Sequence, residues 1–373
     1  MKAPYLNFNE TDYNPFLNGS GGEVAIFIGK TSNTTKANTL LKFKNYKTAN
    51  KTVESGGLGV ENNNTPNPLL NVLKDFFIES SKTSTTDIGV NHVYAIDMGE
   101  NPTIEDWITA LNITSKKRDI TLLAFVGITD ISFMYTVESF IKNLTSTGDL
   151  RIAYFQIPGD DSTLIKYTDP KQETYIQKSR IYLVEEEYFG RTIANIALTP
   201  YYEEPGYSYY RSIEPGTFKE RSIEEEDALF SAGIIFNRDE VCINPIKPCI
   251  CCGVSTAFSI EESEERPNDS LLHARRNADH QIRELFKIIS PQLKRNETET
   301  NLRYIKSDCE TYLENEYNNG YIHKDFEINV IESQINPFSL FITGKIVPVN
   351  STLAIDVSCY IGEADLTVAE EIT

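Results

Sequence analysis

The sequence predicts an α/β domain followed by an α+β domain, with terminal segments that exchange strands between copies. Three observations lead to this fold class. Apolar runs typical of buried strands alternate with amphipathic helices, two long helices precede further strands, and an apolar–polar alternation recurs near the last residues. The predicted units are an extended arm over 1–20, the α/β domain over 21–199, the α+β domain over 200–345 and a terminal strand and arm within 346–373.

The composition argues against nucleic acid as a partner. The 373 residues carry Asp+Glu 54 against Lys+Arg 35, a formal net charge of −19, whereas binding to phosphates needs clustered positive charge. No apolar run reaches the roughly 18 residues that span a bilayer. The first residues also lack the apolar core of a signal peptide. We therefore expect a cytoplasmic protein with no direct membrane insertion.

The α/β domain is expected to begin with a buried strand over Val24–Gly29. Residues 33–68 are rich in Asn, Thr and Gly, which favours a loop with one short element near Thr39–Phe43. After this loop, strands and helices alternate at the spacing of parallel strands joined by helices. We expect strands over 90–96, 120–127, 151–159 and 180–184, and helices over 69–78, 103–111, 132–144 and 190–198.

Aspartates follow several of these strands and provide the main argument for an enzyme. Ligands of parallel sheets bind beyond the carboxyl ends of the strands, where carboxylates can bind a divalent cation or transfer protons. No nucleophile or histidine lies beside these aspartates in the sequence, and acidic residues there also cap helices. The alternative function is a metal-dependent α/β enzyme that uses Asp97, Asp130, Asp160 and Asp161.

The α+β domain opens with a Tyr- and Pro-rich connection over 200–211 and a helix over 222–233. Ser222 and Glu225 have the spacing of a capping box at the start of that helix. A hairpin is expected over 234–243, and a cysteine cluster lies beside it. The spacing of these cysteines differs from that of structural zinc sites, which favours small buried side chains over metal ligands. The cluster consists of Cys242, Cys249, Cys251 and Cys252.

Two amphipathic helices are expected over 270–289 and 298–317, followed by a strand over 326–331. The first helix combines an apolar stripe with an exposed basic face, which is unusual in so acidic a chain. A charged helix face exposed to water explains this pattern as well as a surface that binds an acidic partner. The basic residues are His273, Arg275, Arg276, Arg283 and Lys287 on the first helix, and Arg303 and Lys306 near the start of the second.

The two ends of the chain carry the candidate contacts between copies. Apolar and polar residues alternate near the C-terminal end, as in a strand with one buried face. Such a strand completes either its own sheet or the open edge of another copy. The residues concerned are Tyr5, Phe8 and Phe16 in the arm, and Leu353, Ile355, Val357, Cys359 and Ile361 in the strand.

Known catalytic motifs are missing from the sequence. The four histidines have no metal-binding spacing, and the chain contains no nucleophile elbow, dinucleotide fingerprint or kinase signature. Lys30 and Thr31 follow an apolar strand rather than the glycine-rich loop that binds phosphate. We therefore expect no catalytic residues, no cofactor and no metal site.

The order of these parts resembles the contractile tail sheath proteins of phages and related injection particles. The resemblance includes the early strand Val24–Gly29, the middle strand 120–126 and the helix that ends at Leu229–Ile234. It also includes the arginine-bearing helix with Arg275 and Arg276, the second helix ending near Asn319, and the segments Ile346–Pro348 and Leu353–Val357. The cysteine cluster departs from the family pattern.

This resemblance implies a structural subunit that stacks as six-membered rings around an inner tail tube and shortens to drive the tube through an envelope. It implies that both terminal arms add strands to the sheets of neighbours, and that Arg303 and Lys306, or Arg275, Arg276 and Arg283, attach to an acidic tube. Further implied partners are a baseplate and a tail terminator. The implied location is a virion tail, with assembly in the host cytoplasm.

Overall fold

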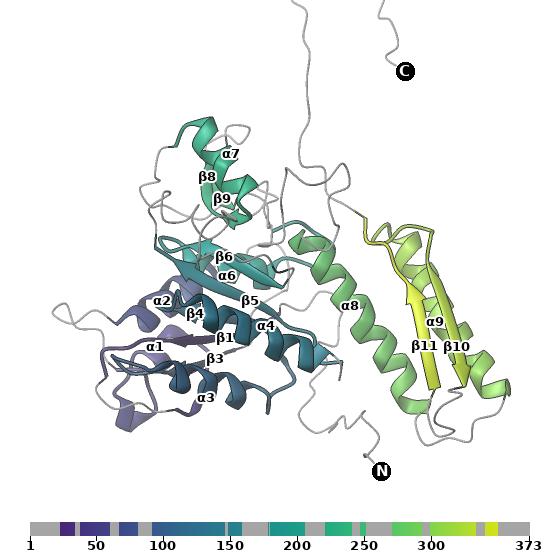
Figure 1. Cartoon of the computed structure of the whole chain (residues 1–373), viewed down its shortest axis with the longest axis horizontal. Coiled ribbons are helices and arrows are strands. Elements are labelled where there is room, and N and C mark those ends of the chain that lie inside the picture. The colour runs from purple at the N-terminus through teal and green to yellow at the C-terminus, as the bar shows by residue number, and fades with distance from the viewer. Residues whose placement is uncertain are drawn as a thin grey trace, which may run out of the picture.

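The computed structural model consists of a sheet domain and a smaller C-terminal unit that are joined along one long helix (Figure 1). It describes residues 23–33, 38–59, 67–80, 92–145, 148–158, 178, 180–205, 221–240, 247–250, 271–292, 299–332 and 340–349. Within these residues, no helix is long and apolar enough to cross a membrane.

A seven-stranded sheet forms the centre of the first unit. Its strand order is β2-β3-β1-β4-β5-β6-β7, and every neighbouring pair is parallel except β2 and β3. The central strands are continuous apolar runs, as expected for strands whose side chains are buried on both faces of the sheet. The strands are β1 (Val24–Gly29), β2 (Leu40–Phe43), β3 (Val93–Asp97), β4 (Ile120–Val126), β5 (Ile152–Ile157), β6 (Ile181–Glu185) and β7 (Ile234–Ile235).

Helices cover both faces of this sheet and give a three-layer arrangement. Alternate residues of β1 enter different cores: Ile26 and Ile28 pack with α3 (Ile104–Thr114) and α4 (Ile131–Thr145). Ala25 and Phe27 pack on the other face with α2 (Pro68–Ser80) and α6 (Phe189–Leu198). The shorter elements are α1 (Tyr46–Ala49), η1 (Val53–Ser55) and α7 (Ile223–Ser231). The mixed α/β fold with a mostly parallel sheet is therefore confirmed.

The C-terminal unit is built on two long helices and an antiparallel strand pair. The helices α8 (Leu272–Ile289) and α9 (Glu299–Asn318) pack with β10 (Glu327–Glu332) around Leu285, Ile305 and Leu313. Strand β11 (Leu340–Lys345) pairs with β10 alone among the described strands. A short 3-10 turn, η3 (Ser290–Gln292), follows α8.

Several elements differ from the sequence predictions or add detail to them. Ile234 and Ile235 do not enter a hairpin, because they are fully buried as β7 beside β6. The hairpin pair is instead β8 (Asn237–Glu240) with β9 (Lys247–Ile250). The sheet thus extends beyond the boundary expected at residue 199. Strand β11 was not predicted, and the element near Thr39 is an edge strand antiparallel to its neighbour.

Candidate assembly surfaces and the arginine junction

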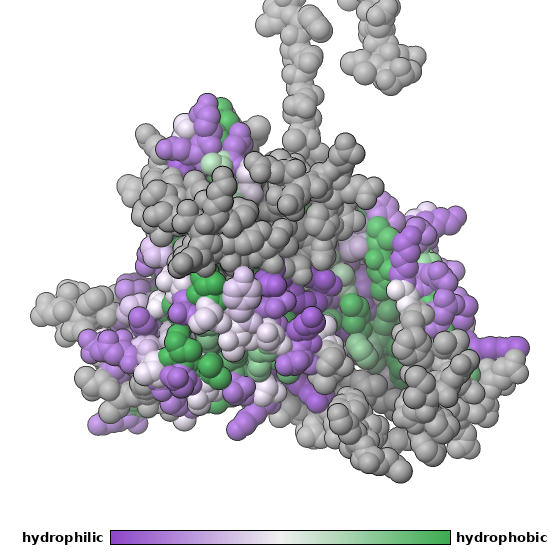
Figure 2. Space-filling view, in the orientation of Figure 1, coloured by the Kyte–Doolittle hydropathy of each residue, from purple (hydrophilic) through white to green (hydrophobic). Residues whose placement is uncertain are grey.

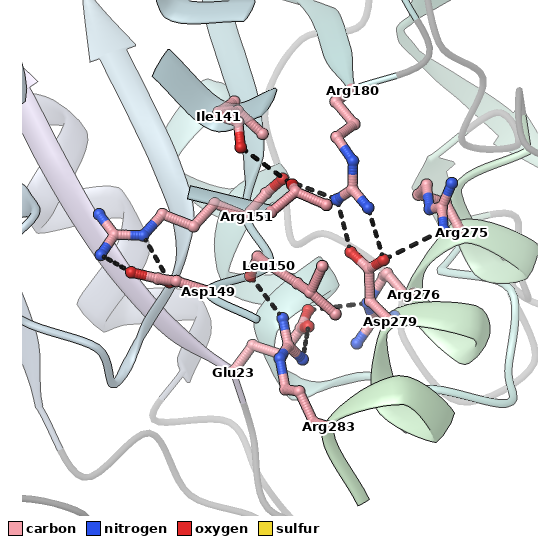
Figure 3. A network of polar contacts seen from close by, with 11 residues as sticks. Glu23, Ile141, Asp149, Leu150, Arg151, Arg180, Arg275, Arg276, Asp279 and Arg283 are labelled. Carbon is pink, nitrogen blue, oxygen red and sulfur yellow. Dashed lines mark hydrogen bonds and ion pairs between the residues drawn. The ribbon is translucent and has the colours of Figure 1, made fainter. Parts of the chain in front are cut away.

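The arginines of α8 form an internal junction with the sheet domain (Figure 3). At its centre is Asp279, which is 1% exposed. Arg180, which precedes β6, donates two hydrogen bonds to this carboxylate, at 2.7 and 2.8 Å. Arg275 lies 3.2 Å from the same carboxylate, one turn earlier on α8. Burial alone would raise the pKa of Asp279, but the charges of Arg180 and Arg275 outweigh it and keep the pKa below its usual value.

The second part of the junction involves Glu23, the residue that precedes β1. Glu23 accepts a hydrogen bond of 2.8 Å from Nε of Arg276 and lies 3.9 Å from Arg283. Arg276 also donates to the backbone oxygen of Thr199, and Arg283 donates to that of Leu150 at 2.7 Å. One helix face is therefore bonded to the start of β1, the end of α6 and the entry to β5 (Figure 3).

The prediction of an exposed basic face on this helix is wrong for two of its residues. His273 and Arg276 are each 1% exposed, and His273 contacts Glu204 at 2.9 Å. Arg275 and Arg283 are partly buried. The reason is that α8, which belongs to the C-terminal unit, faces the sheet domain with its charged side (Figure 1), so these side chains meet acidic groups from distant parts of the chain rather than water. Arg276 and Glu23 are 253 positions apart, which periodicity within the helix cannot reveal.

Aromatic side chains reinforce the junction near the C-terminal unit. The ring of Tyr201 stacks on His280 with centroids 3.6 Å apart, and its hydroxyl donates to Glu316 at 2.9 Å. Gln281 donates to the same carboxylate at 2.6 Å. Tyr202 stacks on Tyr321 at 4.1 Å. The segment after α6 is therefore attached to both α8 and α9.

The basic residues at the start of α9 lie in a different environment. Arg303 is exposed, and Lys306 is partly exposed and lies 3.6 Å from Glu310 on the next turn. Tyr304 between them is 62% exposed. Such i,i+4 pairs contribute only about 0.3–0.5 kcal/mol and leave the ammonium group accessible. Among the predicted basic residues of α8, Lys287 is also partly exposed, and it pairs with Glu284.

The strand pair β10–β11 leaves two outer edges without a described partner. Six residue pairs join the strands, from Glu327 with Lys345 to Glu332 with Leu340. Apolar side chains beside the pair are only partly buried, among them Ile288, Phe326 and Ile346. Figure 2 shows hydrophobic surface in this region, between α8 and β11. Open edges beside incompletely covered apolar groups favour the addition of another strand.

The predicted strand-exchange residues lie outside the described residues. This holds for Tyr5, Phe8 and Phe16 of the arm and for the terminal strand residues Leu353, Ile355, Val357, Cys359 and Ile361. The open edges of β10 and β11 were not predicted from the sequence. The reason is that β11, which begins at Leu340, has no long alternation of apolar and polar residues that would indicate a strand.

The strand-end aspartates that the structure describes have structural partners. Asp97 is 1% exposed and accepts hydrogen bonds from Thr31, Asn33 and the backbone of Gly99 at 2.5, 2.5 and 2.8 Å. Asp130 caps α4, and hydrogen bonds from Ser132 and the backbone of Phe133 lower its pKa. Asp160 and Asp161 lie outside the described residues. Asp97 and Asp130, the two aspartates of the enzyme hypothesis that the structure describes, thus accept hydrogen bonds from groups of the same chain.

The described residues contain no group of three or more His, Cys, Asp or Glu side chains that could hold a metal ion. Of the cysteine cluster, Cys249 lies in β9, while Cys242, Cys251 and Cys252 lie outside the described part. Cys309 on α9 is fully buried, and burial raises the pKa of its thiol to about 11. It packs in the core of the C-terminal unit, as free cysteines commonly do.

Comparison with known proteins identifies the fold. No protein-family model matches the chain, and no curated protein matches it either. The sheath of an extracellular contractile injection system, PVC, in its contracted state matches with a TM-score of 0.65 and 12% identity, over 93% of this chain and 96% of that one. The helical sheath of the anti-feeding prophage in its contracted state matches with 0.64 and 11%, over 92% and 94%.

A third match comes from a six-fold symmetrised baseplate structure of the anti-feeding prophage. Its TM-score is 0.63 at 12% identity, and it covers 97% of this chain and 100% of that chain. At such identity the likeness lies in the arrangement of elements, which spans both the sheet domain and the C-terminal unit. The expected resemblance is confirmed at this level: the chain has the fold of contractile sheath proteins.

Proposed function

We propose that this chain is the structural subunit of a contractile sheath, which polymerises around an inner tube and shortens to drive the tube through a target envelope. The observation that carries the proposal is the fold match over more than nine-tenths of both chains to two contracted sheaths. A chain that matches end to end has the parts needed for the same assembly. The proposed location is a contractile tail or injection particle, either on a virion or assembled in the host cytoplasm.

The enzyme hypothesis has less support. Asp97 is buried and accepts hydrogen bonds on both carboxylate oxygens, and Oδ1 of Asp130 accepts hydrogen bonds at the start of α4. A metal-binding carboxylate needs free lone pairs facing a cavity. The proposed subunit works without catalytic residues or a cofactor, through interfaces that have two stable arrangements.

Electron microscopy of the purified full chain tests the proposal. We expect tubes or cogwheel-shaped rings, and rings with six subunits in projection. A uniform small oligomer at all concentrations that binds a divalent cation would contradict the sheath function and favour the enzyme.

We further propose that the two terminal arms join neighbouring copies by adding strands to the open edges of β10 and β11. The support is that the outer edges of β10 and β11 have no partner among the described strands, together with partly buried apolar groups in this unit. Arms joined in this way would keep copies connected while the lattice changes, because strand pairing fixes one end of each link. The proposed contacts use Tyr5, Phe8 and Phe16, and the apolar face of the strand from Leu353 to Ile361.

Deletion of residues 1–16 tests this linkage. The truncated chain is expected to remain folded and to stay monomeric. A finer variant changes Tyr5, Phe8 and Phe16 to Ala, with Tyr13→Ala as the matched control. Normal tubes from the truncated chain would contradict the proposal for the N-terminal arm.

The inner tube is the second proposed partner, and the start of α9 is the proposed attachment site. The side chain of Arg303 is exposed and that of Lys306 is partly exposed, whereas Arg275, Arg276 and Arg283 are more deeply buried against the sheet domain. We expect the double variant Arg303→Glu and Lys306→Glu to form contracted tubes but few extended, tube-filled particles. Lys324→Glu, at another exposed position, is the control. An unchanged yield of extended particles would remove these residues from the attachment site. A baseplate and a tail terminator complete the proposed partners.

A further inference from the structure

One outer edge of the seven-stranded sheet is strongly basic in an otherwise acidic chain. Strand β2 is the first in the sheet order, and no described strand lies beyond it. From Asn38 to Val53 the sequence has four lysines and neither Asp nor Glu, although the whole chain carries a net charge of −19. All four lysines are exposed, and within the described part of the chain none forms an ion pair. They are Lys42, Lys44, Lys47 and Lys51, here called the lysine edge.

The lysine edge has a fixed backbone. Phe43 and Ala49 are buried in the core beneath it, at 2% and 0% exposure. Asn45 caps α1 by accepting a hydrogen bond of 3.0 Å from the backbone of Thr48. The Lys42 ammonium lies over the ring of Tyr94, 5.6 Å from its centroid. Because this backbone is fixed, binding of a partner has to order only the lysine side chains and not the strand or the helix that carries them.

The opposite edge of the same sheet is acidic. There, helix α7 leads into β7, the last strand of the order. Helix α7 exposes Glu224 and Glu225 in its first turn and Asp227 just after it, and Ile223 beside them is 75% exposed. Glu186 and Glu187, which follow β6, are also exposed. Figure 2 shows hydrophilic side chains over α7 at the top of the molecule.

We propose that the lysine edge of one copy binds the acidic α7 edge of the next copy. This inference rests on the proposed sheath function and adds which surfaces meet. Copies with a net charge of −19 repel each other, so close association requires local pairing of opposite charge. The lysine edge is a described surface that carries several exposed cations and no described ion pair, so an acidic surface of a neighbouring copy is attracted to it. The exposed Ile223 provides an apolar group at the centre of the contact.

The placement of the two surfaces determines how the copies associate. Because they lie at opposite edges of one sheet, the contact joins different surfaces of the two copies. Such a heterologous contact repeats head to tail and gives closed rings or open helices rather than two-fold dimers. This is the geometry that stacked rings need.

Charge reversal at either edge should prevent assembly, and mixing should restore it. The first variant is Lys44→Glu with Lys47→Glu, which makes both edges acidic. The second is Glu224→Lys with Asp227→Lys, which makes both edges basic. In an equimolar mixture each edge of one variant meets the opposite charge on the other, so alternating copies satisfy every contact. Lys142→Glu with Lys324→Glu, two exposed lysines elsewhere, changes the net charge by the same amount as the first variant and is the control.

The readout is the protein concentration at which tubes or rings appear by sedimentation and electron microscopy. We expect each variant alone to need at least about tenfold more protein than the control, and the mixture to return to the control value. Fluorescence of Trp107, which is buried in the sheet core, verifies that both variants are folded. Folded variants that assemble alone like the control would overturn the inference, and so would a mixture that fails to assemble. If the wild-type chain forms neither tubes nor rings, the sheath function itself fails instead.

Discussion

Replacing Asp279 by Asn is the sharpest test of the arginine junction. The change keeps the size of the side chain but removes the negative charge that faces Arg180 and Arg275. The side chains of Arg180 and Arg275 are 12% and 17% exposed, so neither guanidinium group recovers full hydration when its partner is lost. Removing one member of a buried ion pair typically costs 3–5 kcal/mol, and the doubly paired geometry places this site in that range. We therefore expect the free energy of unfolding to fall by about 3–5 kcal/mol.

Urea denaturation of the monomeric, arm-truncated chain measures this change. Trp107 is the only tryptophan and lies in the sheet core, so its fluorescence reports on the unit that α8 contacts. Asp308→Asn, at an exposed position on α9, is the matched control and should change stability by less than about 0.5 kcal/mol. A loss for Asp279→Asn no larger than that of the control would refute the reasoning. Because the pKa of Asp279 is lowered in the folded state, its contribution is present above pH 4 and disappears in acid.

Three further predictions concern other parts of the fold. Burial and the nearby charge of Arg283 lower the pKa of His280 from 6.5 to about 3. The free energy of unfolding should therefore fall as the pH drops below 6.5, with a slope that approaches about 1.4 kcal/mol per pH unit. Urea titrations at several pH values should show this slope, and His280→Phe should flatten it. Gly190→Ala should destabilise the chain by about 1–3 kcal/mol or more in thermal unfolding, because the new Cβ would lie 2.1 Å from the backbone oxygen of Val72. Unchanged stability would contradict the close approach of α2 and α6. Ser222→Ala removes the cap of α7 and should cost about 0.5–2 kcal/mol by the same assay, with no loss if the cap is absent.

Local sequence was sufficient for the elements that have a strong pattern of their own. β1 and β4 are continuous apolar runs bounded by glycine, and the capping box of α7 was visible as Ser222 and Glu225. Short edge elements lacked such patterns. β7 has only two residues, and its place beside β6 depends on tertiary packing rather than on propensity.

The candidate site was harder to predict for a different physical reason. An amphipathic helix with arginines normally turns them to water, and nothing within 270–289 indicates that a second unit covers that side. The partners Glu23 and Arg180 come from the entries to distant strands. Arg303 is exposed and Lys306 is partly exposed, while their role at a tube stays a prediction.

The position of Glu23 has a mechanical consequence. This residue immediately precedes β1, and its backbone N–H donates to Ala197 at the end of α6 while its carboxylate binds Arg276. If the preceding arm connects copies, tension on that arm enters the subunit at one residue and divides between the sheet and the long helix. The two units would then be pulled together as a single body, so a moving neighbour would displace the whole subunit instead of peeling away its first strand.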